Sequence, residues 1–576
     1  MYGERGEEIH AESSYHGMDS SDGGVLGAAR AKVVDDPTGA GKNKKGSYDL
    51  FHTFLIFVFP ALGGLLFGYD IGSTSVVLTQ LEDEDASGTK WYDTVADSPI
   101  LRGLITSTGV IGAMVGSIII FTIADDIGRK RTLLCAGILY IAGALIEAFS
   151  GAPSFNTVAG ISLLLLGRAL YGLGCGFAMH GAPAYIGEMA PPSIRGLLVS
   201  LKEAFIVLGM TLGYIFGYIF QETPGGWRYT YGLASIFAFI FFVGIWFLPY
   251  SSRWLALRGR MEEAKESMRF VSPNITEEEV EEVLQAAEEA ARLQKMDDGV
   301  DDDGLAGGSG SEEAPTPTCT RWHNAFQREY RRFQAPAVKA ALIAGVGVIV
   351  FQQITGQPSV LYYANSIFDS IGLSGAASIG VSVFKLAMTL GTTVTVDRYG
   401  RKLLLYIGCV SMLVALVLLS VLFAFPTTTA TQYSILAALF VYIGGYQIGF
   451  GPIAWLFISE IFPLEVRGKA VSIAVVTNFF WNAVMSLVFP VEIDAIGASA
   501  TFMIYGAILV VAIYFIHRKV PETKGLSLEE ITRKFLGQAK ADKALEEAGG
   551  DEGPNSPLLG IDDNNSAHSD PREINI

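Results

Sequence analysis

Long apolar stretches alternate with short polar turns between about residues 53 and 517 of the 576-residue chain. An α-helix needs roughly 20 apolar residues to cross the ~30 Å hydrocarbon core of a bilayer, and twelve stretches in this chain are long enough. The short alternating segments that indicate a membrane β-barrel do not occur in the sequence. The pattern therefore predicts an all-α membrane protein with twelve spanning helices. The expected spans are 53–77, 101–124, 132–150, 159–186, 197–220, 229–249, 335–368, 373–396, 403–424, 433–459, 468–491 and 499–517.

The composition agrees with a membrane protein and excludes several other classes. Half of the residues are apolar and 17% are charged, whereas soluble proteins average about 25% charged residues. The net charge of −17 argues against a nucleic-acid partner, because binding to phosphates requires clustered Lys and Arg. The four cysteines lie far apart, without metal-ligand spacing or a disulfide framework. We expect no cofactor, no metal and no enzymatic activity.

The acidic charge lies mainly outside the apolar stretches. Residues 1–52, 256–335 and 518–576 together carry −15, and the loop 81–98 adds −5. The remainder of the chain is slightly basic, at +3. Acidic, low-complexity runs such as 297–318 usually stay solvated, so we interpret these segments as hydrophilic tails and loops. A binding site for a partner is the alternative.

Lys and Arg in the short loops predict the orientation, because these residues favour cytoplasmic loops. Basic residues follow the second, fourth, eighth and tenth spans, whereas the acidic loop 81–98 follows the first. We therefore expect both termini to be cytoplasmic. Because the first fifty residues are polar, we expect no cleavable signal peptide.

An internal repeat divides the chain into two parts. The pattern DxxGRK at 125–130 recurs at 397–402, and ExxPxxxRG at 188–196 recurs at 460–468. Pro249 and Pro521 are separated by the same offset of 272 residues. Parallel repeats of six helices are characteristic of major-facilitator carriers, which bind substrate near the midplane. The expected segments are a mostly disordered cytoplasmic N-terminal tail (1–52), a six-helix half (53–249), a cytoplasmic linker, helical and then disordered (250–335), a second half (336–517) and a cytoplasmic C-terminal tail (518–576).

Several sequence motifs resemble those of the sugar-porter family. They are GGLLFGYDIG (63–72), DDIGRKR (125–131), GRALYGLGCG (167–176), PAYIGEMAPPSIRG (183–196), FQQITGQPSVLYY (351–363), VDRYGRK (396–402), GPIAWLFISEIFPLEVRG (451–468) and PETKG (521–525). The resemblance extends over residues 53–530, and the form with Gln357 and Pro358 is most similar to plant vacuolar glucose carriers, also called D-xylose–proton symporter-like proteins. It implies the major-facilitator fold and transport of a monosaccharide by alternating access.

Asp70 lies inside the first expected span, where an ionised carboxylate costs on the order of 2.5–3.5 kcal/mol or more. A structural cap or a buried ion pair is one interpretation, and a proton carrier is the other. The resemblance implies that Asp70 and Arg168 form the proton-coupling pair of a symporter. Passive animal glucose carriers usually have a neutral residue at this position, so Asp70 favours symport.

Glu203 and Lys385 differ from the neutral amides that sugar porters often have in the fifth and eighth spans. Because one buried charge alone is expensive, the two charges suggest a compensated pair close to the sugar. The alternative is that they lie on different faces of their helices.

The resemblance implies further sugar contacts. Gln352 and Gln353 supply neighbouring amides for vicinal hydroxyls, and Trp455 supplies an apolar face for a pyranose ring. Asn478, Phe67, Tyr362 and Gly451 complete the predicted site, and Tyr362 and Tyr363 are expected at the outer gate. Pro358 replaces a usual Asn, which removes one hydrogen bond expected from the family.

The repeated motifs place acids and bases at helix ends on the cytoplasmic side. Topology alone explains the bases but not the acids, so we expect salt bridges that hold a cytoplasmic gate shut. The eight gate residues are Asp125, Arg129, Glu188, Arg195, Asp397, Arg401, Glu460 and Arg467.

The sequence thus predicts a multi-pass transporter of a hexose or pentose, with glucose favoured, coupled to protons and functional as a monomer in the plasma or vacuolar membrane. Its expected partners are the sugar, H⁺ and the lipid bilayer. An uncoupled sugar or polyol carrier is the alternative. A transporter-like sugar sensor is disfavoured, because such sensors carry longer tails and lose coupling residues.

Overall fold

The computed structural model describes residues 49–191, 194–273, 275–278, 280–281, 333–373, 375–426, 428–526 and 530–537. The chain divides into two units, 1–46 and 47–576, and all of the described residues belong to the second. The N-terminal tail, the low-complexity part of the linker and most of the C-terminal tail, where we expect disorder, lie outside the described residues.

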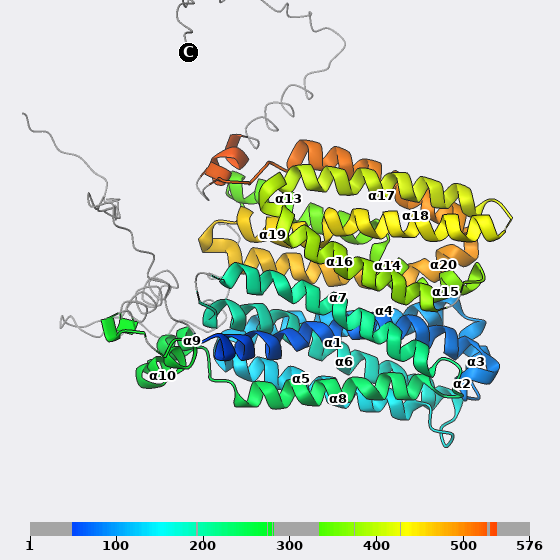
Figure 1. Ribbon diagram of the computed structural model, residues 1–576, viewed down its shortest axis with the longest axis horizontal. Helices are drawn as coiled ribbons and strands as arrows, with labels where there is room; N and C mark the ends of the chain where they lie inside the picture. The colour runs from blue at the N-terminus through cyan, green and yellow to red at the C-terminus, as the bar shows by residue number, and fades with distance from the viewer. Residues whose placement is uncertain are drawn as a thin grey trace, which may run out of the picture. The chain divides into compact units, whose positions relative to one another are not determined.

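The first set of long helices, called here the N-terminal set, covers six expected spans (Figure 1). Its members are α1 (Leu50–Glu82), α4 (Pro99–Ile127), α5 (Arg129–Ser150), α6 (Thr157–Met189), α7 (Arg195–Phe220) and α8 (Trp227–Phe247). Two short helices, α2 (Glu84–Ser87) and α3 (Tyr92–Ala96), form the acidic loop after α1. After α8 come α9 (Ser252–Leu257) and α10 (Met261–Val271), in the segment expected as the helical part of the linker.

The second set, called here the C-terminal set, contains both long and short helices. Its members are α13 (Pro336–Ile354), α14 (Gln357–Tyr362), α15 (Ala364–Ser370), α16 (Ala376–Tyr399), α17 (Arg401–Phe423), α18 (Thr429–Ile448), α19 (Phe450–Ile461) and α20 (Leu464–Lys519).

The last helix, α20, accounts for two expected spans. Among the described residues, eleven helical stretches are long and apolar enough to cross a membrane, and the last of them covers 54 residues. At 1.5 Å per residue it measures about 80 Å, far more than the ~30 Å of a hydrocarbon core. Gly497 interrupts it with φ 80° and ψ 160°, at the turn predicted between 468–491 and 499–517. The twelve predicted crossings are therefore present.

Two of the expected spans each contain more than one helix in the structure. Gly356, with φ 88°, separates α13 from α14, and Pro358 sits in the first turn that follows. Gly449, with φ −97° and ψ −93°, separates α18 from α19. Hydropathy does not register such breaks, because the residues around them remain apolar. Broken membrane helices free backbone groups, and such breaks are tolerated where they line a cavity or a site.

Each set is held together internally, and the two sets contact one another through a few helices. In the N-terminal set, α5 packs on α6 and α8, and α1 packs on α7. Between the sets, α4 packs on α20 and α7 on α16, while α1 contacts α14 and α15. These contacts bring α1 close to the short helices α14 and α15 of the C-terminal set.

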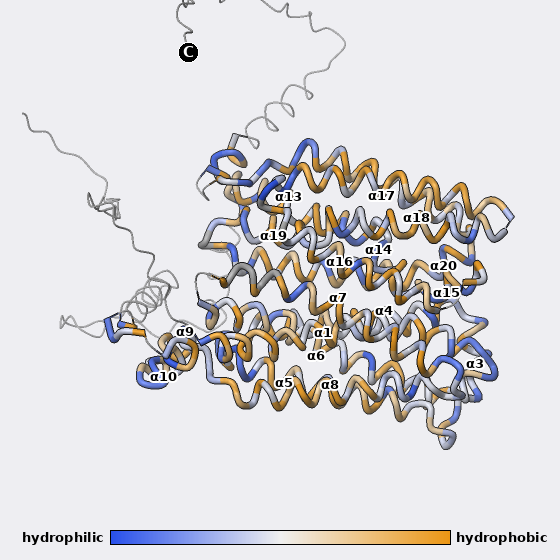
Figure 2. Tube along the Cα trace, in the orientation of Figure 1, coloured by the Kyte–Doolittle hydropathy of each residue, from blue (hydrophilic) through white to orange (hydrophobic). Residues whose placement is uncertain are grey.

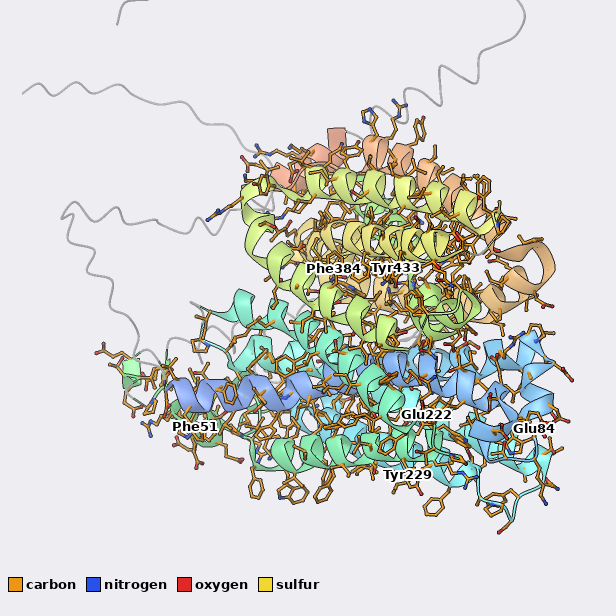
Figure 3. All side chains as sticks on the ribbon, turned by 45° about the vertical axis from the view of Figure 1, so that its right-hand side comes forward. Phe51, Glu84, Glu222, Tyr229, Phe384 and Tyr433 are labelled. Atoms are coloured by element: carbon orange, nitrogen blue, oxygen red, sulfur yellow. The ribbon has the colours of Figure 1, made fainter. Side chains whose placement is uncertain are left out.

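Hydrophilic segments gather at the two ends of the helices, and the helices between them are mainly apolar (Figure 2). We call the end with α2 and α3 the acidic end, and the end with the turns at Gly128 and Gly400 the basic end. Figure 3 shows Glu84 of α2 at the acidic end and Phe51, at the start of α1, at the opposite end. Both turn glycines have φ above 80°, a conformation that favours glycine, which explains the repeated Gly of DxxGRK.

Candidate functional site

A buried ion pair joins α1 to α6. Arg168 donates from Nη1 to Asp70 Oδ1 at 2.9 Å and from Nη2 to Asp70 Oδ2 at 3.1 Å. Arg168 is fully buried, and Asp70 is 7% exposed. Bidentate pairing of this kind is strong and fixes the geometry of both groups. The structure therefore brings together the two residues that the sequence assigned to proton coupling.

Two neutral side chains complete the surroundings of this ion pair. Arg168 Nη1 also donates to Thr74 Oγ1 at 3.0 Å and to the Tyr231 hydroxyl at 3.2 Å. The Thr74 hydroxyl donates in turn to Asp70 Oδ1 at 3.4 Å. The guanidinium carbon of Arg168 lies 5.6 Å from the centroid of the Tyr231 ring. These groups orient the charges without adding any charge of their own.

A second carboxyl, which the sequence analysis did not single out, belongs to the same group. Glu147 of α5 is 1% exposed, and its Oε1 lies 3.9 Å from Arg168 Nη1. This oxygen has no hydrogen-bond partner among the described residues. The signal available in the sequence was that Glu147 is the one acid within the expected span 132–150. Glu147 belongs to no recognisable motif. It lies close to Arg168 because α5 packs on α6, and the sequence does not show this packing.

Buried amides meet at the two breaks of the C-terminal set. Gln352 Nε2 donates to the Phe450 carbonyl oxygen at 2.8 Å, which connects the end of α13 to the start of α19. Asn478 Nδ2 of α20 donates to Gln352 Oε1 at 3.4 Å, and Gln353 Nε2 donates to the same oxygen at 3.4 Å. All three amide side chains are buried. The structure thus brings these three predicted sugar-binding residues together.

Several polar atoms at the same breaks have no hydrogen-bond partner among the described residues. They are Gln353 Oε1, Gln357 Nε2, the Tyr362 hydroxyl and both side-chain polar atoms of Gln447. Leaving a buried polar group unsatisfied costs about 1–3 kcal/mol, and native proteins keep few of them. Amides offer both donors and acceptors, so the set suits a ligand with several hydroxyls. Gln357 and Gln447 were missed, although each lies within two residues of a break.

Glycine and aromatic residues shape the surroundings of these amides. A Cβ at Gly451 would lie 3.0 Å from Gln447 Nε2, so the glycine leaves room for that amide. Phe67 of α1 and Phe479 of α20 meet edge to face, with ring centroids 6.1 Å apart. Trp455 is half-buried on α19, four residues beyond Gly451. The aromatic contact between Phe67 and Phe479 therefore comes from both sets of helices.

Glu203 and Lys385, which we expected as a compensated pair close to the sugar, do not contact one another directly. Their helices α7 and α16 pack together, and each side chain experiences the charge of the other. No nitrogen–oxygen distance of 4.0 Å or less joins these two described side chains. Lys202 is the other cation that acts on Glu203, and Lys385 Nζ lies 5.8 Å from the centroid of the Tyr446 ring. The two charges thus interact without a direct ion pair, and their compensation close to the sugar stays a prediction.

At the basic end, the N-terminal set carries its own ion-pair network. Arg129 donates from Nη1 to Asp125 Oδ1 at 2.7 Å and from Nε to Glu188 Oε1 at 2.9 Å. The Ser251 hydroxyl donates to the Glu188 carboxylate. The Trp254 indole N–H donates to the Asp125 carbonyl oxygen at 2.9 Å, which attaches α9 to the end of α4.

The C-terminal set repeats this network 272 residues later. Arg401 Nη2 lies 2.7 Å from Glu460 Oε1, and the Thr523 hydroxyl donates to Glu460 Oε2 at 2.7 Å. Arg467 donates to the carbonyl oxygen of Phe462 at 3.1 Å. These contacts lie within one set, so they do not by themselves join the two sets into a closed gate. The side chains of Arg195 and Asp397 lie outside the described residues.

One position differs between the two networks. The Glu522 carboxylate accepts the backbone N–H groups of Arg401 at 3.0 Å and Lys402 at 2.9 Å, at the start of α17. Partial burial raises the pKa of Glu522, but backbone N–H donors outweigh burial and hold the pKa below its ordinary value. The equivalent residue in the N-terminal set is Tyr250, whose ring centroid lies 4.9 Å from Lys130 Nζ.

The two sets are hydrogen-bonded to one another at the acidic end. The Tyr363 hydroxyl lies 2.8 Å from Thr106 Oγ1 of α4. The Asn365 backbone N–H donates to Ser75 Oγ at 3.1 Å, and Asn365 Nδ2 donates to Thr79 Oγ1 at 2.9 Å. Tyr363, expected at the outer gate, therefore connects the two sets near this end.

A family model described as "Sugar (and other) transporter" matches residues 56–535. The chain belongs to this family of sugar transporters. It is an integral membrane transporter of the major facilitator superfamily, and it is not an enzyme.

Curated relatives of this sugar transporter come from plants and bacteria. D-xylose-proton symporter-like 3, chloroplastic, of Arabidopsis thaliana is 42% identical, with 85% of this chain and 84% of the relative covered. The D-xylose transporter of Levilactobacillus brevis is 32% identical, with 85% and 98% covered.

Among solved structures, the transporter is similar to the xylose transporter XylE from E. coli in a partially occluded inward-open conformation. The TM-score is 0.67 and the identity is 27%, with 83% of this chain and 100% of that chain covered. An inward-open structure of XylE matches with the same TM-score of 0.67.

Proposed function

We propose that this sugar transporter carries a monosaccharide, with glucose as the first candidate, together with a proton. The observation that carries the proposal is the close association of two features on packed helices. One is the buried Asp70–Arg168 pair, and the other is the set of unpartnered amides at the breaks of the C-terminal set. A neutral sugar can use the amides, and the carboxylate can bind the proton.

The amide cluster supports a polyhydroxylated substrate. The atoms that lack protein partners include acceptors, such as Gln353 Oε1, and donors, such as Gln357 Nε2. Each sugar hydroxyl can donate one hydrogen bond and accept others, so it can satisfy both kinds of atom. Trp455 and Phe67 offer apolar faces to the C–H side of the ring. Relatives named as xylose and glucose transporters support this substrate class.

The ion pair supports proton coupling. When Asp70 is ionised, it satisfies Arg168; when it binds a proton, that attraction weakens and the N-terminal set loses a contact between α1 and α6. A change of this kind can bias a two-state carrier. Relatives named as D-xylose-proton symporter-like proteins agree with the proposal.

We further propose that residues 53–249 and 336–517 are the two moving halves, and that both termini lie in the cytoplasm. The clustered Lys and Arg of the basic end support this orientation. The contacts at the acidic end then close the outer side, which corresponds to an inward-facing state. The charged pair and the amides belong to one chain, so we expect a functional monomer.

For the membrane that holds it, we propose the plasma membrane or the vacuole. The name of one relative adds the chloroplast as the competing site. A fluorescent fusion imaged with organelle markers in its own cells decides between these membranes.

The test of function is uptake of labelled hexoses and pentoses into proteoliposomes, with and without an inward proton gradient. We expect accumulation of sugar above equilibrium only with the gradient. Asp70→Asn should abolish accumulation while sugar counterflow persists, because counterflow needs no net proton movement. If wild-type uptake did not depend on the proton gradient, the protein would be an uncoupled carrier.

A binding variant provides the matched control. Gln353→Leu should raise the KM for sugar in counterflow, because it removes an amide from the cluster. Gln80→Leu replaces a buried amide that donates to the Phe220 carbonyl oxygen, away from both clusters. We expect Gln80→Leu to keep the wild-type KM.

A further inference from the structure

The charges around Arg168 do not balance if both neighbouring carboxyls are ionised. Asp70 and Glu147 both lie within 4 Å of the same nitrogen, Arg168 Nη1. One guanidinium then faces two carboxylates, which leaves a net charge of −1 in a buried site. An uncompensated buried charge is strongly unfavourable, so a proton is the simplest source of balance.

The geometry distinguishes the two carboxyls. Asp70 accepts two hydrogen bonds from the guanidinium and one from Thr74. Among the described residues, no group donates a hydrogen bond to the Glu147 carboxyl, and its contact with Arg168 is a longer one of 3.9 Å. Its Oε1 is buried and unpartnered within the described part of the chain. The surroundings thus favour an ionised Asp70 and a protonated Glu147.

The backbone holds Glu147 in this place. A Cβ at Gly167 would lie 2.8 Å from Glu147 Cγ, so the glycine that precedes Arg168 leaves space for the Glu147 side chain. On α5, the Ser150 hydroxyl donates to the Glu147 carbonyl oxygen at 2.6 Å. The Glu147 side chain therefore leaves α5 at a point where α5 lies close to the backbone of α6, beside Arg168.

Other titratable groups around Glu147 are few. Arg168 and Tyr171 come from α6, Tyr231 from α8 and Asp70 from α1. From α4, which is described over its whole length, no charged side chain acts on Glu147. Because tyrosines remain neutral near pH 7, the charge state of the site depends on Asp70, Glu147 and Arg168.

We propose that Glu147 is a second proton-binding residue of the transporter, and that the coupled proton is shared between Glu147 and Asp70. Two carboxyls beside one cation behave as a single titrating unit. In the arrangement described here, the proton resides on Glu147 while Asp70 pairs with Arg168. When Asp70 takes the proton, the Glu147 O–H bond breaks and its electron pair stays on Glu147. The new carboxylate then pairs with Arg168, and the site remains neutral.

This inference rests on the proposed symport, and it predicts a particular failure when either carboxyl is removed. In Glu147→Gln, Asp70 and Arg168 already balance, so the site gains little by binding a proton. We expect loss of proton-driven accumulation, with counterflow retained. Where residual uptake remains, its half-maximal external pH should fall by about one unit or more, which is tenfold in proton concentration. Glu147→Asp, which keeps the acid, should restore part of the accumulation.

Three outcomes separate the possibilities. In the first, Glu147→Gln keeps the wild-type pH profile and full accumulation, while Asp70→Asn is uncoupled. This result overturns the shared proton and leaves the symport proposal intact. Equal losses of counterflow and accumulation in Glu147→Gln indicate a structural role and also overturn it. A wild-type protein that never accumulates sugar against a gradient overturns the symport proposal, and the coupling role of Glu147 with it.

A spectroscopic measurement tests the proton directly. The infrared carbonyl band of a protonated carboxyl should be present in wild type at neutral pH and should disappear in Glu147→Gln. It should also disappear in Asp70→Asn, because the remaining Glu147 then ionises to balance Arg168. A band that survives in Asp70→Asn contradicts sharing. Ser235→Ala on α8 is the matched control, because the Ser235 hydroxyl also donates to the carbonyl oxygen three residues earlier, that of Gly232, at 2.6 Å. This variant should retain both the band and accumulation.

Discussion

Arg168 is the cation of the buried cluster, and its removal should be costly. In Arg168→Leu, two carboxyls lose their partner inside the membrane. Breaking a buried ion pair by removing one partner costs about 3–5 kcal/mol, so we expect a marked drop in thermal stability in detergent. Adding Asp70→Asn and Glu147→Gln to the same chain should recover most of the loss. A single Arg168→Leu variant that unfolds at the wild-type temperature would contradict this account of the cluster.

At the residue scale, the sequence identified site residues that lie in recognisable motifs and missed residues that only helix packing brings to the site. Asp70 and Arg168 lie in recognisable strings, GGLLFGYDIG and GRALYGLGCG. Glu147 and Gln447 are single polar residues within apolar runs, without a spacing to mark them. The distance between Glu203 and Lys385 was also beyond the sequence, because it depends on the rotation of α7 against α16.

At the element scale, a single carboxylate at the start of a helix can stabilise the whole helix. Glu522 accepts the N–H groups of Arg401 and Lys402 at the start of α17. Because the pKa of Glu522 in the folded state is lowered, its contribution to stability is present above the unfolded pKa. That contribution disappears as the pH falls through the folded pKa.

We therefore expect Glu522→Gln to lower stability at pH 7 by no more than about 1 kcal/mol, since partial exposure screens the charge. The difference from wild type should shrink as the pH falls below about 4, the ordinary range of glutamate. Thermal unfolding in detergent at several pH values measures it. If the stability difference between Glu522→Gln and wild type increased on acidification, it would contradict the stabilisation of α17 by the Glu522 carboxylate.

The contact between α1 and α7 depends on glycine. A Cβ at Gly68 would overlap the carbonyl oxygen of Ile206, which is backbone and cannot move aside. Small residues allow membrane helices to approach closely, and overpacking typically costs 1–3 kcal/mol. Gly68→Ala should destabilise the protein by about that amount. Gly391→Ala on α16 is the control, because a Cβ there meets no atom within 4 Å, and it should be neutral or slightly stabilising.

At the element scale, hydropathy predicted the crossings but not the breaks within them. The expected span 335–368 and the expected span 433–459 each contain a glycine that ends one helix and begins another. The chain stays apolar through both breaks, so composition gives no warning. The breaks bring polar side chains of α13, α14 and α18 together at the candidate site, which is why the sequence revealed only part of that site.

For the whole molecule, closure of the acidic end should control transport. The Asn365 N–H group lies 3.1 Å from Ser75 Oγ, so cysteines at these two positions are close enough to oxidise to a disulfide. In a chain without its four native cysteines, Ser75→Cys with Asn365→Cys should lose sugar uptake on oxidation and regain it on reduction. Either cysteine alone should leave uptake insensitive to oxidant. Unimpaired uptake by the fully cross-linked protein would show that this end need not open.

The offset of 272 residues was the strongest statement that the sequence made about the whole fold. It predicted two sets of helices with equivalent turns, and the networks around Arg129 and Arg401 repeat at this offset, down to Ser251 and Thr523. The offset did not indicate which conformation the carrier adopts. Which end is closed depends on contacts between the sets, such as that of Tyr363 with Thr106, and a repeat within each set carries no information about them.

Because the described contacts of each network lie within its own set, neither set needs a covalent connection to the other in order to hold its basic end together. The transporter should therefore assemble from two fragments that are expressed separately. Two polypeptides, residues 1–300 and 301–576, made in the same cell should find one another through the faces of α4 with α20 and α7 with α16, and restore sugar uptake that neither fragment supports alone. The covalent connection between the sets would then serve to produce them in equal numbers.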